Sequence, residues 1–192
     1  SALWEKLYTF TAMSGRRGAV ICAIGAIDMA LWDIKGKALG LPCYKLLGGA
    51  MRDHIMPYAS LQPEGNSVEQ YGDSLVSWAK RAREYGFKAA KMECTLAGPY
   101  NHSGLQGSDE QMTEIVRACR ETVGPDFAMM VDVQYRWSDV HSCLRTVSRW
   151  DDLDLFFLET PLQIDDLDGY ATLSREAPMR IAAGEWQNTR FE

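Results

Sequence analysis

The sequence predicts an α/β fold, specifically an incomplete (β/α)8 barrel of the TIM type with about five strand–helix units. Three observations support this prediction. From about residue 50 onward, short apolar runs alternate with amphipathic helical patterns, which is typical of parallel strands joined by right-handed crossovers. Three of the apolar runs end in a carboxylate, at Asp132, Glu159 and Glu185. The 192 residues fall short of the roughly 250 that a closed barrel needs.

The part of the chain before the barrel is predicted to be helical from Arg17 to Leu39. Apolar residues recur there at steps of three and four, namely at Ile21, Ile24, Ile27, Ala30, Leu31 and Ile34. Gly40 and Pro42 end this helix. A short further helical turn is expected from Tyr44 to Leu47.

The barrel part follows as strands and helices in turn. Strands are expected at 55–60, 87–94, 127–133, 155–159 and 180–183. Helices are expected at 67–85, 108–123, 139–150 and 165–174. Because five units do not close a barrel, an open five-stranded sheet is the alternative. The carboxylates at the strand ends favour the barrel, whose active sites are built from the C-terminal ends of several strands.

Composition excludes several classes of function. The net charge of −6 argues against nucleic-acid binding. No apolar run approaches the roughly 20 residues of a membrane span, and the N-terminus lacks the pattern of a signal peptide. The five cysteines match no metal-binding or CxxC spacing. We therefore expect a cytoplasmic protein with reduced cysteines and with no nucleic-acid or membrane partner.

The three strand-end acids, Asp132, Glu159 and Glu185, are spaced at nearly one strand–helix period. Carboxylates gathered at one edge of a barrel repel each other unless a cation joins them. Oxygen ligands suit Mg²⁺, and the absence of His and Cys from the set argues against zinc. The structural alternative is that each acid caps a neighbouring helix or pairs with a lysine.

The second expected strand carries Lys91 and Glu93, which share a face because side chains alternate along a strand. If Ala89 faces the barrel interior, both reach the rim near the predicted metal. Lys91 is then a candidate base with a lowered pKa, or a charged group that holds a substrate carboxylate. A plain ion pair of Lys91 with Glu93 or Asp132 is the structural alternative.

Four stretches of the chain form a recognisable set. They are the helix 26–40, Leu46-Leu47-Gly48-Gly49, the segment 86–91, and the three acids in their order and spacing. In these the chain resembles the enolase superfamily, specifically its mandelate racemase/muconate lactonizing enzyme-like branch. The resemblance implies the helical part of an N-terminal α+β capping domain at 1–49 and the first part of the barrel domain at 50–192. It also implies that Asp132, Glu159 and Glu185 bind Mg²⁺.

The resemblance further implies a shared reaction step. A proton alpha to a carboxylate is removed, and Mg²⁺ stabilises the enediolate that results. The expected substrate is a small carboxylate, an acid sugar that loses water, and the expected enzyme is an acid-sugar dehydratase. A racemase or cycloisomerase of the same superfamily is one alternative, and an inactive fragment or pseudoenzyme that keeps the metal site is another. A homo-oligomer is expected, as in the family.

Two positions depart from the family pattern. Glu93 stands where the family often has the second lysine of Lys-x-Lys, and Gln134 stands where other members have a His. Glu93 is a candidate catalytic residue, as the base itself or in the metal shell, with a structural role as the alternative. Gln134 is a candidate substrate contact. The loop after the second strand adds Tyr100 and His102 as candidate substrate contacts, with a plain surface loop as the alternative.

Overall fold

The computed structural model describes residues 2–192, so Ser1, where the predicted capping part begins, lies outside the described residues. The chain divides into two compact units, one of residues 1–55 with 185–192 and one of residues 56–184. No helix within residues 2–192 combines the length and the apolar character that crossing a membrane requires.

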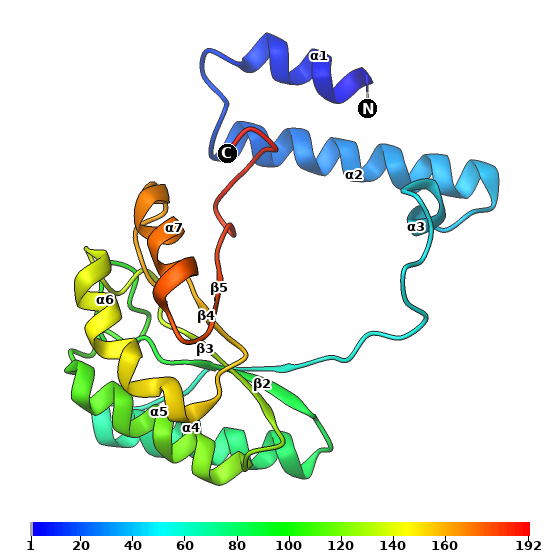
Figure 1. Ribbon diagram of the computed structural model, residues 1–192. Coiled ribbons are helices and arrows are strands. Elements are labelled where there is room, and N and C mark those ends of the chain that lie inside the picture. The colour runs from blue at the N-terminus through cyan, green and yellow to red at the C-terminus, as the bar shows by residue number, and fades with distance from the viewer. Residues whose placement is uncertain (1) are drawn as a thin grey trace. The chain divides into compact units, whose positions relative to one another are not determined.

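The first unit is helical. It contains α1 (Ala2–Thr11), α2 (Ala19–Leu39) and α3 (Cys43–Leu46) (Figure 1). α2 confirms the predicted long helix, and it ends because Gly40 adopts a left-handed conformation with φ of 63°. Residues 185–192 belong to this unit and are held by two ion pairs of 2.7 Å, Arg17–Glu192 and Arg190–Glu5.

The second unit is a parallel sheet with helices on one face (Figure 1). Its strands are β1 (Ala59–Leu61), β2 (Ala89–Glu93), β3 (Ala128–Asp132), β4 (Phe157–Glu159) and β5 (Arg180–Ala182), in that order across the sheet. Its helices are α4 (Val68–Glu84), α5 (Asp109–Val123), α6 (Val140–Val147) and α7 (Leu167–Glu176), with the 3-10 helix η1 (Ser148–Leu153) after α6. The five-stranded parallel sheet with alternating helices confirms the α/β fold class.

Two predicted elements need correction. The strand expected at 55–60 is β1, which begins only at Ala59; Ile55 and Met56 are 83% and 60% exposed. Pro57 has no N–H to donate to a strand ladder, so pairing starts beyond it. The helix expected at 139–150 is α-helical only to Val147 and continues as η1, which ends where Asp154 adopts φ of 45°.

One face of the sheet packs against the core, and the opposite face carries Lys91 and Glu93. Its core face packs on α4 to α7 through fully buried side chains, among them Met92, Met129, Val131, Leu158, Leu75, Met112, Val116 and Leu173. Burial of each such side chain stabilises the fold by about 1.5–3 kcal/mol. Since side chains alternate along a strand, Lys91 and Glu93 lie on the opposite face from Met92, as predicted.

The partly buried carboxylate of Asp109 ties α5 to the elements that follow β3. Asp109 Oδ1 accepts hydrogen bonds from Arg136 Nη2 at 2.6 Å and Nε at 2.9 Å, and Oδ2 accepts from Trp137 Nε1 at 3.2 Å and Thr146 Oγ1 at 2.5 Å. Burial acts to raise the pKa of Asp109, but the hydrogen bonds from Thr146, Arg136 and Trp137 outweigh it and lower the pKa below its usual value. The segment 133–137 is thereby fixed beside the strand ends.

Asp109→Asn should destabilise the protein at neutral pH by about 1.5–3 kcal/mol, the usual contribution of hydrogen bonds to a charged group. Because folding lowers this pKa, the contribution is present above the unfolded pKa of about 3.9 and is lost as the pH falls through the folded value. Urea unfolding at pH 7 and at acidic pH measures both effects. Asp152→Asn, in the exposed pair with Arg117, is the control and should change stability far less. A destabilisation of equal size for the two variants would contradict the prediction.

Candidate active site

Three acids lie in one row across the sheet. Glu93 pairs with Asp132, and Asp132 pairs with Glu159, in the register of β2, β3 and β4. Neighbouring strands are only about 4.8 Å apart, so the three acids are adjacent at the C-terminal edge of the sheet. Lys91 stands two residues before Glu93 and therefore on the same face. The register thus brings together four of the predicted site residues.

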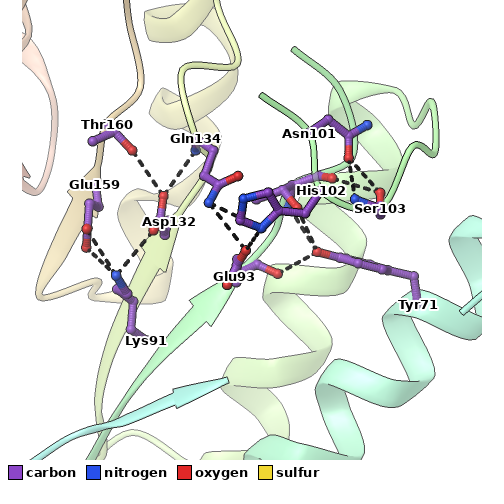
Figure 2. A network of polar contacts seen from close by, with 11 residues as sticks. Tyr71, Lys91, Glu93, Asn101, His102, Ser103, Asp132, Gln134, Glu159 and Thr160 are labelled. Carbon is purple, nitrogen blue, oxygen red and sulfur yellow. Dashed lines mark hydrogen bonds and ion pairs between the residues drawn. The ribbon is translucent and has the colours of Figure 1, made fainter. Parts of the chain in front are cut away.

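Lys91 bridges two of these acids. Its Nζ lies 3.2 Å from Asp132 Oδ2, and 3.0 and 2.9 Å from Glu159 Oε1 and Oε2 (Figure 2). The side chains of Lys91 and Asp132 are only 13% and 8% exposed. The Lys91–Asp132 ion pair that we considered as a structural alternative is therefore present. Within residues 2–192, no ion pair joins Lys91 to Glu93.

The two carboxylates decide the protonation of Lys91. Burial acts to lower the pKa of Lys91, but the hydrogen bond to Glu159 and the charges of Asp132 and Glu159 outweigh it and raise the pKa above its usual value. The lowered pKa that we considered for Lys91 applies to a lysine beside bound Mg²⁺ and stays a prediction. The carboxylates of Asp132 and Glu159 both contact the Lys91 ammonium, so they converge on one cation. Carboxylate oxygens placed in this way also suit Mg²⁺.

Asp132 is held in a fixed orientation. Its Oδ1 accepts hydrogen bonds from Thr160 Oγ1 at 3.0 Å and from the backbone N–H of Gln134 at 3.1 Å. Gln134 and Thr160 have φ of 45° and 46°, a left-handed conformation that is uncommon for residues other than glycine. Such conformations persist where the surrounding structure enforces them, and they cluster at functional sites. Here they aim two donors at one carboxylate oxygen.

A second cluster lies beside the first (Figure 2). His102 Nδ1 is 2.7 Å from Glu93 Oε1, and Gln134 Nε2 donates to the same oxygen at 3.4 Å. The Glu93 side chain is 8% exposed, whereas that of His102 is 58% exposed. Tyr71 Oη donates to the backbone carbonyl of Glu93 at 2.8 Å. The structure therefore brings together three residues that we singled out, Glu93, Gln134 and His102.

A polar cavity of about 270 Å³ adjoins this second cluster. It is lined by Gln62, Pro63, Glu64, Tyr71, Glu93, Thr95, His102 and Ser103. All of these residues belong to the second unit. The cavity gives a small polar molecule access to both Glu93 and His102.

Tyr100 and Glu185 are the remaining predicted site residues. The ring of Tyr100 packs edge-on against Tyr135, with centroids 5.3 Å apart. Glu185 comes three residues after the end of β5 and belongs to the first unit, whereas Asp132 and Glu159 belong to the second. Its place beside them therefore stays a prediction. Among residues 2–192, no group of three or more Asp, Glu, His or Cys side chains is arranged to hold a metal ion.

Sequence reasoning missed two residues that shape the site. Thr160 binds Asp132, and the available signal was its position directly after the strand-end acid Glu159. Tyr71 falls within the helix expected at 67–85, and the residue is 2% exposed. Its hydroxyl nevertheless reaches the end of β2, which no local pattern indicates.

Comparison with known families identifies the chain. Residues 74–192 match the family model described as enolase C-terminal domain-like. Residues 1–48 match that of the mandelate racemase/muconate lactonizing enzyme N-terminal domain. The chain belongs to the enolase superfamily. Within the superfamily it falls in the mandelate racemase/muconate lactonizing enzyme branch, and the resemblance inferred from the sequence is confirmed.

Relatives of this enolase-superfamily chain carry names of several reactions. It is 34% identical over 192 residues to arabinonate dehydratase of Saccharolobus solfataricus, covering 99% of this chain and 47% of the relative. It is 30% identical over 189 residues to D-galactarolactone cycloisomerase of Agrobacterium fabrum, covering 98% and 47%. The crystal structure of rhamnonate dehydratase from Gibberella zeae complexed with Mg superposes with a TM-score of 0.75 at 31% identity, covering 96% of this chain and 41% of that one. The chain thus spans about half the length of the curated relatives it matches.

Proposed function

We propose that this chain contributes the metal-binding and proton-transfer groups of a Mg²⁺-dependent acid-sugar dehydratase. The observation that carries the proposal is the Lys91 ammonium held between Asp132 and Glu159 at the ends of adjacent strands. Two carboxylates that converge on one cation, that of Asp132 buried and that of Glu159 partly buried, suit a divalent metal. The dehydratase names of relatives support an acid sugar as the substrate.

Asp132 and Glu159, together with Glu185, would hold Mg²⁺. When bound, Mg²⁺ supplies charge stabilisation for the enediolate that forms as the proton alpha to the carboxylate leaves. Thr160 and the Gln134 backbone keep Asp132 oriented, which is how groups around a metal ligand fix its geometry. We further propose that residues 1–49 form the helical part of the capping domain and residues 50–192 the first part of the barrel domain. The full protein is proposed to form a homo-oligomer.

Lys91 is the basic group nearest to these ligands. It serves either as the base that takes the alpha proton at Nζ or as the charged donor that holds the substrate carboxylate. Gln134 and Tyr100 are the proposed substrate contacts. Glu93 and His102 lie on the other side of Asp132 from Lys91, as Figure 2 shows.

The test is the reaction of the full-length protein with a panel of acid sugars in the presence of Mg²⁺. A dehydratase should form a 2-keto-3-deoxy acid from at least one of them, with loss of one water as seen by mass spectrometry. Chelation with EDTA should stop the reaction, and Mg²⁺ should restore it. Turnover that persists in EDTA would contradict the metal-dependent mechanism.

A cycloisomerase is the second candidate, favoured by the relative that carries that name. It shares the first half of the reaction, removal of the alpha proton. The product distinguishes the two candidates, because ring opening of a lactone by a cycloisomerase conserves mass whereas dehydration does not. The same panel, extended with sugar lactones, therefore decides between them.

A further inference from the structure

We propose that His102 is the general acid of this site and that Glu93 positions it. The inference rests on the proposed function, because an acid-sugar dehydratase must protonate the hydroxyl group that leaves. Glu93 occupies a strand-end position beside Asp132, and His102 reaches it from the loop after β2. The pair supplies the acid–base group that the sequence pattern of β2 and β3 lacked.

The tautomer of His102 follows from its partner. A carboxylate only accepts hydrogen bonds, so Nδ1, 2.7 Å from Glu93 Oε1, carries a proton. The polar contacts of His102 within residues 2–192 all involve Nδ1. Nε2 is therefore the ring nitrogen that exchanges a proton with a bound molecule.

The placement of the pair suits an elimination reaction. Asp132 separates the two proton-handling groups: Oδ2 faces Lys91, and Oδ1 accepts from Gln134, whose side chain donates to Glu93. The alpha hydrogen and the leaving hydroxyl lie on neighbouring carbons of an acid sugar. A substrate at this edge of the sheet would therefore meet a separate group at each of the two carbons.

The loop that carries His102 is ordered by its own hydrogen bonds. Ser103 Oγ donates to the Thr95 carbonyl at 3.0 Å, and Asn101 Nδ2 donates to the Leu105 carbonyl. Thr95 in turn donates its backbone N–H to the Tyr71 hydroxyl at 3.1 Å. His102 is half exposed at the cavity that it shares with Glu93, so it has access both to a substrate and to solvent protons.

The proposed step balances without another reactant. The alpha C–H bond breaks, its proton passes to a base, for which neutral Lys91 Nζ is the candidate, and its electron pair forms the double bond to the neighbouring carbon. The C–O bond of the leaving hydroxyl breaks, the electron pair stays on oxygen, and the proton of His102 Nε2 converts that oxygen to water. Neutral His102 keeps its Nδ1–H on Glu93 and regains a proton from solvent. The enol product then tautomerises to the keto acid.

The test separates the two halves of the reaction in the full-length protein. His102→Gln keeps an amide donor for Glu93 but cannot transfer a proton. We expect product formation to fall by about 10²–10⁴-fold, while exchange of the substrate alpha proton in D₂O persists. Mg²⁺ affinity should stay unchanged. His141→Gln, at an exposed position on α6, is the matched control and should leave both rates unchanged.

Two further variants test the partnership. His102→Ala should lose product formation and regain part of it when imidazole is added. Glu93→Gln should lower kcat for product formation while leaving KM and alpha-proton exchange nearly unchanged, which a merely structural role would not do.

The outcomes distinguish this proposal from the function on which it rests. If His102→Gln loses exchange and product formation together, or neither, His102 is not the general acid. If the unaltered protein shows no exchange with any acid sugar, the proposed function fails, and the role of His102 fails with it.

Discussion

Asp132→Asn should abolish measurable Mg²⁺ binding by the full-length protein, and with it turnover. Asp132 is 5% exposed and its carboxylate accepts hydrogen bonds from Lys91, Thr160 and Gln134, so its geometry is fixed before any metal ion binds. Asn preserves the shape and one acceptor oxygen but removes the charge that Mg²⁺ requires. Isothermal titration calorimetry with Mg²⁺ measures the loss directly, and Asp132→Ala should behave in the same way.

Thr160→Val provides the graded control for this experiment. It removes the hydroxyl that donates to Asp132 Oδ1 at 3.0 Å and leaves the carboxylate charge in place. Loss of such a supporting contact typically costs about 10–100-fold in metal affinity. The expected order of Mg²⁺ affinity is therefore wild type, then Thr160→Val, then Asp132→Asn. Undiminished Mg²⁺ binding by Asp132→Asn would contradict the assignment of Asp132 as a metal ligand.

Lys91→Met should lower turnover by about 10²–10⁴-fold, the usual contribution of a positioned proton-transfer group. The same substitution should leave Mg²⁺ affinity intact or increase it. The reason is that the Lys91 ammonium lies between the two carboxylates that the metal would use. Steady-state kinetics and calorimetry on the same variant provide both numbers.

Lys91→Arg separates the two roles that we propose for Lys91. Arginine keeps the positive charge and cannot be deprotonated at neutral pH. Turnover that survives in Lys91→Arg but not in Lys91→Met would assign Lys91 as a charged donor to the substrate. Loss in both variants would assign it as the base. Unchanged turnover in Lys91→Met would make Lys91 structural.

The fold was predictable where local chemistry marks the ends of elements. Ser108 begins α5 because its hydroxyl accepts the N–H of Gln111 at 3.2 Å, while the Gln111 side chain returns to the Ser108 N–H at 2.9 Å. The helix α1 was missed although Leu3, Leu7 and Phe10 recur there at steps of four and three; it has only ten residues and buries none of them. The first strand was misplaced because the apolar pair before Pro57 is exposed.

The first half of the site was also predictable. Asp132 and Glu159 end buried strands in adjacent positions, and the alternation of side chains placed Lys91 on their face. The sequence did not reveal the net effect of burial and of the neighbouring charges on the pKa of Lys91. Whether burial or the two carboxylates dominate its pKa depends on distances of about 3 Å, which follow from packing rather than from spacing along the chain.

The second half of the site depends on the path of a loop. His102 and Glu93 were each predicted as site residues but not as a pair, because no pattern in residues 94–107 indicates where the loop turns back. Gly98, with φ of 98°, permits that turn: a Cβ there would come within 2.9 Å of Arg136 Cα. This close approach brings the loop against the segment after β3, where Gln134 contacts both His102 and Glu93.

The central claim is that this edge of the sheet serves Mg²⁺-dependent removal of a proton alpha to a carboxylate. The most direct measurement is proton NMR of acid-sugar substrates incubated in D₂O with the full-length protein, with Mg²⁺ or with EDTA. With Mg²⁺ and the unaltered protein, we predict loss of the alpha-proton signal or conversion of the substrate to a keto product. We predict neither result in EDTA nor with Asp132→Asn. An alpha proton that exchanges equally in Asp132→Asn, or that never exchanges with any carboxylate substrate, would contradict the account.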